Sequence, residues 1–172
     1  MKKLMVALAA IALAGATQAA TMSWSVLNMQ ARDIEAGWLV ALYDSSTTFD
    51  YASAKDGTLA AMYTGTAYSS GTTIRANDSG LGSYSSGDTV SAYAVVFNAA
   101  TIADATQVLI SDVQSATVNA QGANISLAFG SMASTGTTNK FRNSTWADAP
   151  EPTSGLLMLV GFGALALRRR RA

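Results

Sequence analysis

The stretch TVSAYAVVFN, residues 89–98, decides the fold that we expect for this chain. Val90, Ala92, Ala94 and Val96 fall on one side of an extended chain, because successive side chains of a strand point in opposite directions. The other side is apolar as well, at positions 93, 95 and 97. The sequence therefore predicts a strand that is covered on both faces.

Further strands are predicted by short stretches rich in Thr, Val, Ile and aromatic residues, which Gly, Ser, Asn and Asp separate. We expect them at residues 22–29, 37–43, 58–64, 72–76, 106–111, 115–119 and 124–130. A helical turn is expected at 100–105, a loop at 132–139 and a last edge strand at 140–146. Short strands at this spacing predict an all-β fold, a single β-sandwich or jelly-roll-like domain.

Two seven-residue stretches resemble each other, YSSGTTI at residues 68–74 and YSSGDTV at residues 84–90. Each is interpreted as a turn that leads into a β-branched strand start. Two copies are too few for a solenoid, so we interpret the similarity as reuse of one turn. Between the copies, NDSG at residues 77–80 is typical of a loop tip.

Residues 1–19 are interpreted as a secretory signal peptide. Lys2 and Lys3 precede an apolar stretch at residues 4–14, which at ~1.5 Å per residue is too short to cross the ~30 Å hydrocarbon core of a membrane. We expect cleavage after Ala19, because the rival site after Ala20 would place a glutamine where a small residue is preferred. This segment implies the secretion machinery and signal peptidase as partners.

The C-terminus combines three features in a fixed order. The only two prolines of the chain, Pro150 and Pro152, flank Glu151 and hold this segment extended. An uncharged apolar run at residues 155–167 is expected to form a short membrane helix of about 20 Å. Four arginines follow and are expected to stay in the cytoplasm as a stop signal; they are Arg168, Arg169, Arg170 and Arg171.

The predicted order is thus a signal peptide at 1–19, an exported body at 20–146, a linker at 147–154, a membrane helix at 155–167 and a cytoplasmic tail at 168–172. The ending, from Pro150-Glu151-Pro152 to the arginine cluster, resembles the PEP-CTERM sorting signal of exported bacterial proteins. This tail type also occurs on some ice-binding proteins. The body carries no comparable resemblance.

The resemblance implies recognition and trimming by an exosortase, an integral-membrane processing enzyme. Pro150, Glu151 and Pro152 would form the sorting motif, with Arg168 to Arg171 as the stop signal. The protein would be anchored in the membrane for a time, with its body outside the cytoplasm. It would then reach the cell surface or the extracellular matrix of a Gram-negative-type bacterium that makes exopolysaccharide.

Composition excludes several classes of chemistry. The chain has no Cys and no His, which removes disulfides, Cys/His zinc sites, thiol nucleophiles and His-based triads. Between residues 20 and 149, five basic residues stand against ten acidic ones, a balance that disfavours a nucleic-acid partner. We therefore expect no nucleic acid, no metal and no cofactor.

Aspartates and aromatic residues are the remaining candidates. Asp44, Asp56, Asp78 and Asp88 neighbour Ser, Gly or Asn, so each is expected to satisfy its own turn, and no catalytic residue is predicted. Most aromatic residues fall in predicted strands and are expected in the core. We predict a non-catalytic envelope or extracellular-matrix protein. A carbohydrate-binding module for exopolysaccharide is the alternative, and a line of exposed coplanar Trp and Tyr rings would favour it.

Overall fold

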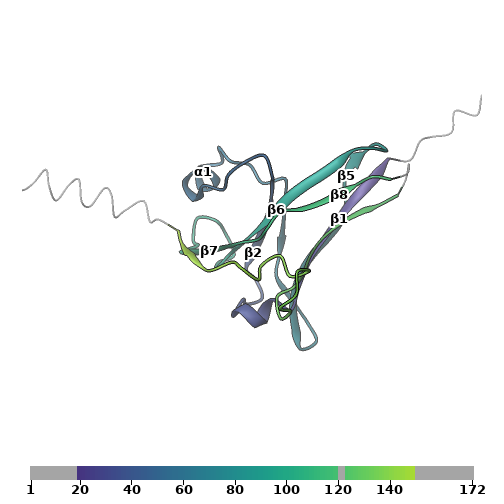
Figure 1. Ribbon diagram of the computed structural model, residues 1–172. Helices are drawn as coiled ribbons and strands as arrows, with labels where there is room; N and C mark the ends of the chain where they lie inside the picture. The colour runs from purple at the N-terminus through teal and green to yellow at the C-terminus, as the bar shows by residue number, and fades with distance from the viewer. Residues whose placement is uncertain (1–18, 120–122, 150–172) are drawn as a thin grey trace, which may run out of the picture.

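The computed structural model describes residues 19–119 and 123–149, and these residues form two β-sheets with two short helices (Figure 1). The elements in chain order are β1 (Ala20–Leu27), the 3-10 helix η1 (Met29–Arg32), β2 (Leu39–Asp44), α1 (Tyr51–Asp56), β3 (Tyr63–Thr66), β4 (Tyr68–Ser70), β5 (Thr73–Tyr84), β6 (Thr89–Phe97), β7 (Gln107–Ile110), β8 (Gln114–Thr117), β9 (Ile125–Ser131) and β10 (Ala147–Asp148). The predicted all-β class is confirmed.

The smaller sheet has four strands in the order β4-β5-β1-β9. The larger sheet has the order β10-β7-β6-β2-β3, and β8 also pairs with β6. Paired strands are antiparallel except β1 and β9, which run parallel. β7 pairs with residues 95–97 of β6 and β8 with residues 89–92, so these two short strands follow one edge of β6 in succession.

A core lies between the two sheets. The even-numbered side chains of β6 from Val90 to Val96 are buried in one cluster with Met22, Trp24 and Val26 of β1. The two sheets therefore pack face to face as a β-sandwich, and apolar burial of this kind is the main stabilising term of a fold without disulfides.

The opposite face of β6 is covered as well. Tyr93, Val95 and Phe97 are buried in a second cluster together with Tyr51 and Ala54 of α1. Figure 1 shows α1 on the side of β6 that faces away from β1 and β5. The prediction that residues 89–98 form a strand with two buried faces is confirmed.

The two short helices were not predicted. The Asp50 carboxylate caps α1 by accepting a backbone N–H of its first turn at 2.8 Å, and Gly57 ends the helix with a φ of 83°. Met29, expected as the last residue of a strand, is the first residue of η1 instead. Asn28 and Asp33 on either side of η1 have positive φ values of 52° and 58°, which end the extended conformation.

Residues 77–80 are not a loop tip, because they lie inside β5, the longest strand. The pairing of β5 with β1 shifts register twice, between Ala20 and Met22 and between Met22 and Trp24. Gly80 and Gly82 have φ values of 73° and 67° at these shifts. A β-bulge inserts a residue into one strand and often uses a glycine at positive φ, so the turn-like residues mark bulges rather than a turn.

Both YSSG stretches form the predicted turns. The first joins β4 to β5 as a hairpin within the smaller sheet, and Gly71 at its tip has a φ of 62°. The second leads from β5 to β6 and thereby carries the chain from one sheet to the other, with Gly87 at a φ of 95°.

Some other boundaries differ from the prediction. The strand expected at 58–64 begins only at Tyr63. Residues 100–105 form bends and a turn rather than a helix, with the Ala105 N–H donating to the carbonyl of Ile102 at 3.3 Å. Among the residues that the structure describes, no helix has the length and apolar character needed to cross a membrane. The membrane helix expected at 155–167 lies outside those residues.

Candidate functional site

The folded body holds the chain up to the residue before the first proline of the predicted sorting motif. β10 pairs with β7 through Ala147 opposite Val108 and Asp148 opposite Gln107. The backbone N–H of Ala149 then donates to the carbonyl of Thr106 at 2.7 Å, and the Ala149 side chain is buried in the second cluster. The sequence assigned residues 147–149 to a linker, but two backbone pairings and an apolar side chain attach them to the larger sheet.

The segment before β10 is a series of turns and not the edge strand expected at 140–146. The Arg32 guanidinium explains this conformation, because it donates to the carbonyls of Phe141 at 2.6 Å and of Ser144 at 3.2 Å. The Phe141 carbonyl also accepts the backbone N–H of Ser144 at 3.1 Å, a bond that closes a turn and not a strand pairing. Trp146 then packs edge-on against Trp38 with ring centroids 5.8 Å apart, which directs the chain toward β7.

The residues of the sorting motif and the stop signal lie outside the described part of the chain, and so does the apolar run between them; they are Pro150, Glu151, Pro152, 155–167, Arg168, Arg169, Arg170 and Arg171. At the other end, the structure describes both residues of the expected signal-peptide cleavage site. Ala19 is exposed, whereas Ala20 is the first residue of β1 and is fully buried between the sheets.

The comparison with protein families gives one match, to the model described as the PEP-CTERM protein-sorting motif, over residues 148–171. The chain therefore carries this motif, as the resemblance predicted. The match begins at Asp148 in β10, one residue before the buried Ala149. Neither the curated proteins nor the solved structures give a significant match to the chain.

A PEP-CTERM motif is a substrate signal for exosortases as a class, so the match supports export and membrane-linked sorting of this chain. The motif occupies only the last part of the sequence, and the β-sandwich lies outside it except for Asp148 of β10 and the attached Ala149. Any activity of the body must therefore be inferred from the body's own side chains.

Three of the four aspartates expected to satisfy their own turns do so, whereas Asp78 lies inside strand β5, where its carboxylate accepts the N–H of Ser79. The carboxylates of Asp44, Asp56 and Asp88 accept the backbone N–H groups of Ser46, Thr58 and Ser85 at 2.8, 2.8 and 2.7 Å. Hydrogen bonds from the side chain and then the backbone of Ser46 hold the pKa of Asp44 below its usual value. The equivalent bonds from Thr58 lower the pKa of Asp56. Ionised carboxylates that are engaged in this way serve local structure.

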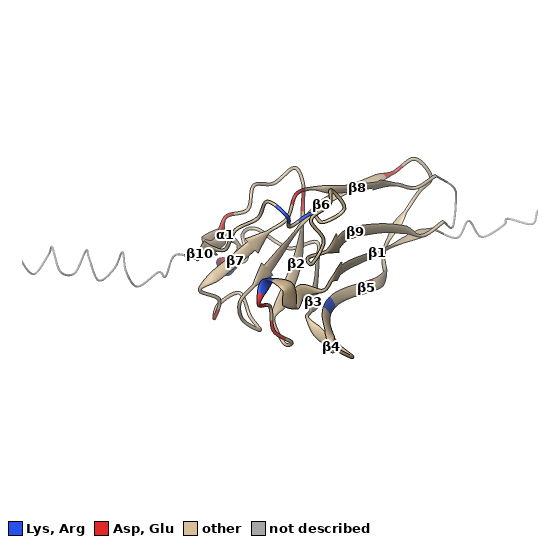
Figure 2. Cartoon of the chain, turned by 60° about the horizontal axis from the view of Figure 1, so that its bottom comes forward, with Lys and Arg blue, Asp and Glu red and all other residues tan. Residues whose placement is uncertain are grey.

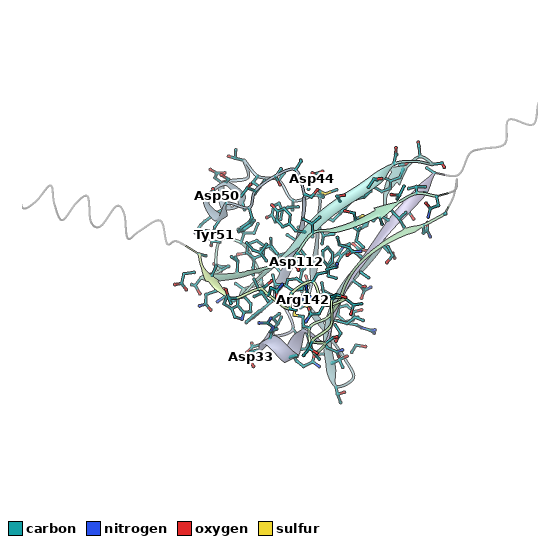
Figure 3. The ribbon with its side chains drawn as sticks, viewed as in Figure 1. Asp33, Asp44, Asp50, Tyr51, Asp112 and Arg142 are labelled. Carbon is teal, nitrogen blue, oxygen red and sulfur yellow. The ribbon has the colours of Figure 1, made fainter. Side chains whose placement is uncertain are left out.

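The carboxylates are also dispersed over the body. Figure 3 shows Asp33 at the opposite end of the body from Asp44 and Asp50, with Asp112 between them. A glycoside hydrolase would need two carboxylates facing each other across roughly 5–9.5 Å. Within residues 19–119 and 123–149, no group of three or more Asp, Glu, His or Cys side chains is placed to hold a metal ion.

On the outer face of the smaller sheet, several polar side chains and an aromatic ring converge on an open surface. Alternate residues of its strands point outward here and line a hollow of about 400 Å³. Its outward-facing polar and aromatic residues are Ser23 and Ser25 of β1, Tyr68 of β4, Arg75 and Asn77 of β5, and Ser126 of β9. We call this surface the Tyr68 face.

Tyr68 is the one aromatic side chain of the described residues that is exposed, with 38% of its surface accessible. The described aromatic residues thus do not form a line of exposed rings, which was the pattern expected of a sugar-binding surface. Tyr68 was not predicted as a site residue, although Tyr68 is the first residue of the repeated YSSG turn. That turn places Tyr68 opposite Arg75 in the β4–β5 hairpin, a register that could have been read from the hairpin geometry.

Proposed function

We propose that this chain is an exported protein without catalytic activity of its own, whose β-sandwich is the cargo of a C-terminal sorting tail. The observation that carries the proposal is the PEP-CTERM match at residues 148–171, which begins within the last strand of the folded body. An exosortase would be the enzyme that recognises and trims the tail. The cell surface or the extracellular matrix would be the destination of the body.

Burial at the N-terminus supports removal of residues 1–19 as a signal peptide. A cut after Ala19 would leave the whole of β1 in the mature protein. A cut after Ala20 would remove a side chain that is 0% exposed and that belongs to the core between the sheets. The fold is therefore compatible with the first site and would lose apolar contacts at the second.

Burial at the C-terminus supports trimming at or after Pro150 in the same way. Ala149 is 5% exposed and its N–H is bonded to Thr106, so a cut on its N-terminal side would detach β10 from β7. A cut within or after Pro150-Glu151-Pro152 would leave every described residue in place. Two prolines are expected to favour an extended conformation in this segment, which a processing enzyme can bind.

The roles proposed for the tail are tested by two sets of substitutions in the native host. Replacing Pro150 and Pro152 by Ala relaxes the extended segment but keeps the apolar run, so the protein is expected to insert and to remain untrimmed in the membrane. Replacing Arg168 to Arg171 by Gln removes the stop signal, so the untrimmed protein is expected to escape into the periplasm. Cell fractionation and the size of the protein on immunoblots distinguish the two results.

A matched control replaces two exposed body residues, Thr135 and Thr137, by Ala, and it is expected to be trimmed like the wild type. Fusion of residues 148–172 to an unrelated exported domain then tests whether the tail is sufficient. If the fusion is neither retained nor trimmed while the native protein is, sorting requires the β-sandwich and the proposal of an autonomous tail is wrong.

A carbohydrate-binding module is the second candidate, and the Tyr68 face is the observation that favours it. An aromatic ring beside hydroxyl and amide groups on an open sheet face offers both stacking and hydrogen bonding to a sugar. Purified protein that binds no polysaccharide in affinity electrophoresis would remove this candidate and leave the sorting proposal untouched.

A further inference from the structure

We infer that the Tyr68 face binds a polysaccharide that carries carboxylate groups, with Arg75 as the residue that recognises the carboxylate. The inference rests on the carbohydrate-binding candidate and is independent of how the tail is processed. It follows from three observations on the described residues: the face is open, the Arg75 guanidinium has no hydrogen-bond acceptor or ion-pair partner, and the groups around it suit a hydroxyl-rich ligand.

The Tyr68 face is uncovered, in contrast to the outer face of the larger sheet. In the larger sheet, the outward side chains of β6 are buried under α1. In the smaller sheet, Tyr68, Asn77 and Ser126 on three different strands are exposed to solvent. From β4 to β9 the face spans three strand spacings, roughly 14 Å, which gives an extended ligand room to lie across the sheet.

Arg75 differs from Arg32 in making no side-chain hydrogen bond or ion pair within the described residues. Arg32 donates to three backbone carbonyls, with its longest contact to the Arg142 oxygen at 3.4 Å. The Arg75 guanidinium lies over the Tyr68 ring, 5.4 Å from the centroid, and its Nε is buried without an acceptor. Within the described residues no carboxylate pairs with it, and Figure 2 shows charged positions scattered over the body rather than gathered around one face.

A guanidinium that lacks a hydrogen-bond acceptor is able to bind a carboxylate of a ligand. Arg presents its N–H donors in a planar fork that matches the two oxygens of a carboxylate, and charge-assisted bonds of this type are among the stronger ones in proteins. Because residues 20–149 carry more acidic than basic side chains, general attraction of polyanions to the body is weak. Binding of an acidic chain would therefore depend on Arg75 itself.

The groups around Arg75 match the remainder of a sugar unit. Tyr68 Oη donates to Asn77 Oδ1, which fixes the exposed ring and leaves the Asn77 amide N–H groups free to donate. The Ser25 and Ser126 hydroxyls make no hydrogen bond within the described residues, and both line the hollow. These donors and acceptors beside a ring are what a hydroxylated pyranose requires.

Asp78 also lines the hollow and limits where the carboxylate can lie. Its Oδ1 accepts the Ser79 N–H at 2.8 Å. Asp78 is three positions after Arg75, about 10 Å along β5. A ligand carboxylate is therefore expected at the Arg75 end of the face, and Asp78 is placed to accept hydroxyl groups at the other end.

The test compares two polysaccharides with one backbone, polygalacturonate and its methyl-esterified form, in which the carboxylates are blocked. Affinity electrophoresis and titration calorimetry with the purified mature protein are expected to show binding to polygalacturonate. Binding to the ester is expected to be weaker by about tenfold or more, which is the ratio typical of one charge-assisted contact. Equal binding to both forms would overturn the role of the carboxylate. No binding to any polysaccharide would remove the carbohydrate candidate as well.

Variants locate the site. Arg75→Gln is expected to weaken polygalacturonate binding by about tenfold or more, whereas the matched control Arg142→Gln, which removes an exposed charge elsewhere, leaves it unchanged. Tyr68→Phe keeps the ring and should retain most of the affinity that Tyr68→Ala loses. An unaltered Tm shows that each variant is folded. Unchanged binding in Arg75→Gln, or competition by inorganic phosphate as strong as that by free galacturonate, would contradict the inference.

Discussion

The contact between Trp24 and Gly65 joins the two sheets, and it provides the sharpest test of the packing. Trp24 of β1 is 1% exposed, and its ring lies against the backbone of Gly65 in β3 of the other sheet. A Cβ added at Gly65 would lie 2.7 Å from Cζ2 and 2.9 Å from Cη2 of the Trp24 ring. Carbon atoms pack at roughly 3.5–4.0 Å, so the ring or β3 must move in a Gly65→Ala variant.

Overpacking of this kind typically costs about 1–3 kcal/mol of unfolding free energy. For a domain of this size, each kcal/mol corresponds to roughly 4 °C, so we expect the Tm of Gly65→Ala to fall by roughly 4–12 °C. Thermal unfolding followed by circular dichroism measures the change, and tryptophan fluorescence reports on the Trp24 environment. Gly65 does not have a positive φ, so backbone strain does not contribute to the expected loss.

Two controls separate this clash from a general effect of alanine. Gly136→Ala introduces a Cβ that is 3.5 Å from its nearest neighbour, an ordinary contact, and is expected to leave the Tm unchanged. In a Trp24→Val background, Gly65→Ala should cost nothing or stabilise slightly, because alanine suits a strand better than glycine does. A Gly65→Ala variant as stable as the wild type, or equally destabilised with and without Trp24, would refute the proposed contact between the sheets.

Three further predictions concern single residues. Gly130→Ala should prevent stable folding, measured as lost soluble yield, because the φ of Gly130 is 78° and a Cβ would lie 2.0 Å from the Thr138 carbonyl oxygen. Burial raises the pKa of Tyr43 to about 12, and the neighbouring charge of Tyr93 adds a smaller increase. The stability that the neutral Tyr43 contributes is therefore present below pH 10 and is lost as the pH rises toward 12. Tyr43→Phe should flatten that alkaline loss in chemical denaturation. Hydrogen bonds from the side chain and the backbone of Ser53 lower the pKa of Asp50 from its ordinary 3.8. The stability that the ionised carboxylate contributes is therefore present above pH 3.8 and is lost on further acidification, so the unfolding free energy of Asp50→Asn should fall less with acid in chemical denaturation.

The central strands could be predicted because their side-chain pattern is determined by two buried faces. Val90, Ala92, Ala94 and Val96 enter one core and Tyr93, Val95 and Phe97 enter the other, so both faces are apolar in the sequence. The open face at Tyr68 could not be found in the same way. Its residues come from four strands, and the sequence does not show which strands are neighbours.

Local signals were missed where they are short. Asp50 and Gly57 are an N-cap and a C-terminal glycine around six helical residues, a helix too short to produce an apolar periodicity. Residues 77–80 were interpreted as a loop tip because bulge and turn residues are alike in sequence. β10 has only two residues, and it forms by pairing with the edge of β7, a strand that lies about 40 residues earlier in the chain.

The position of β10 also limits where a processing enzyme can cut the chain. Ala149 is the last described residue and is attached to the larger sheet, so the sorting motif follows the body with no free linker before it. Any processing enzyme must therefore approach the edge at β7 and β10 closely. The exosortase is then expected to cut on the C-terminal side of Ala149, which leaves every described residue in place.

Mass spectrometry of both ends of the native protein, purified from the cell surface or the medium, tests this account most directly. The expected protein begins at Ala20 and ends at or shortly after Pro150-Glu151-Pro152, without Arg168 to Arg171. A surface-exposed or released protein that still begins at Met1, or that retains the arginine cluster, would contradict export and trimming as proposed here.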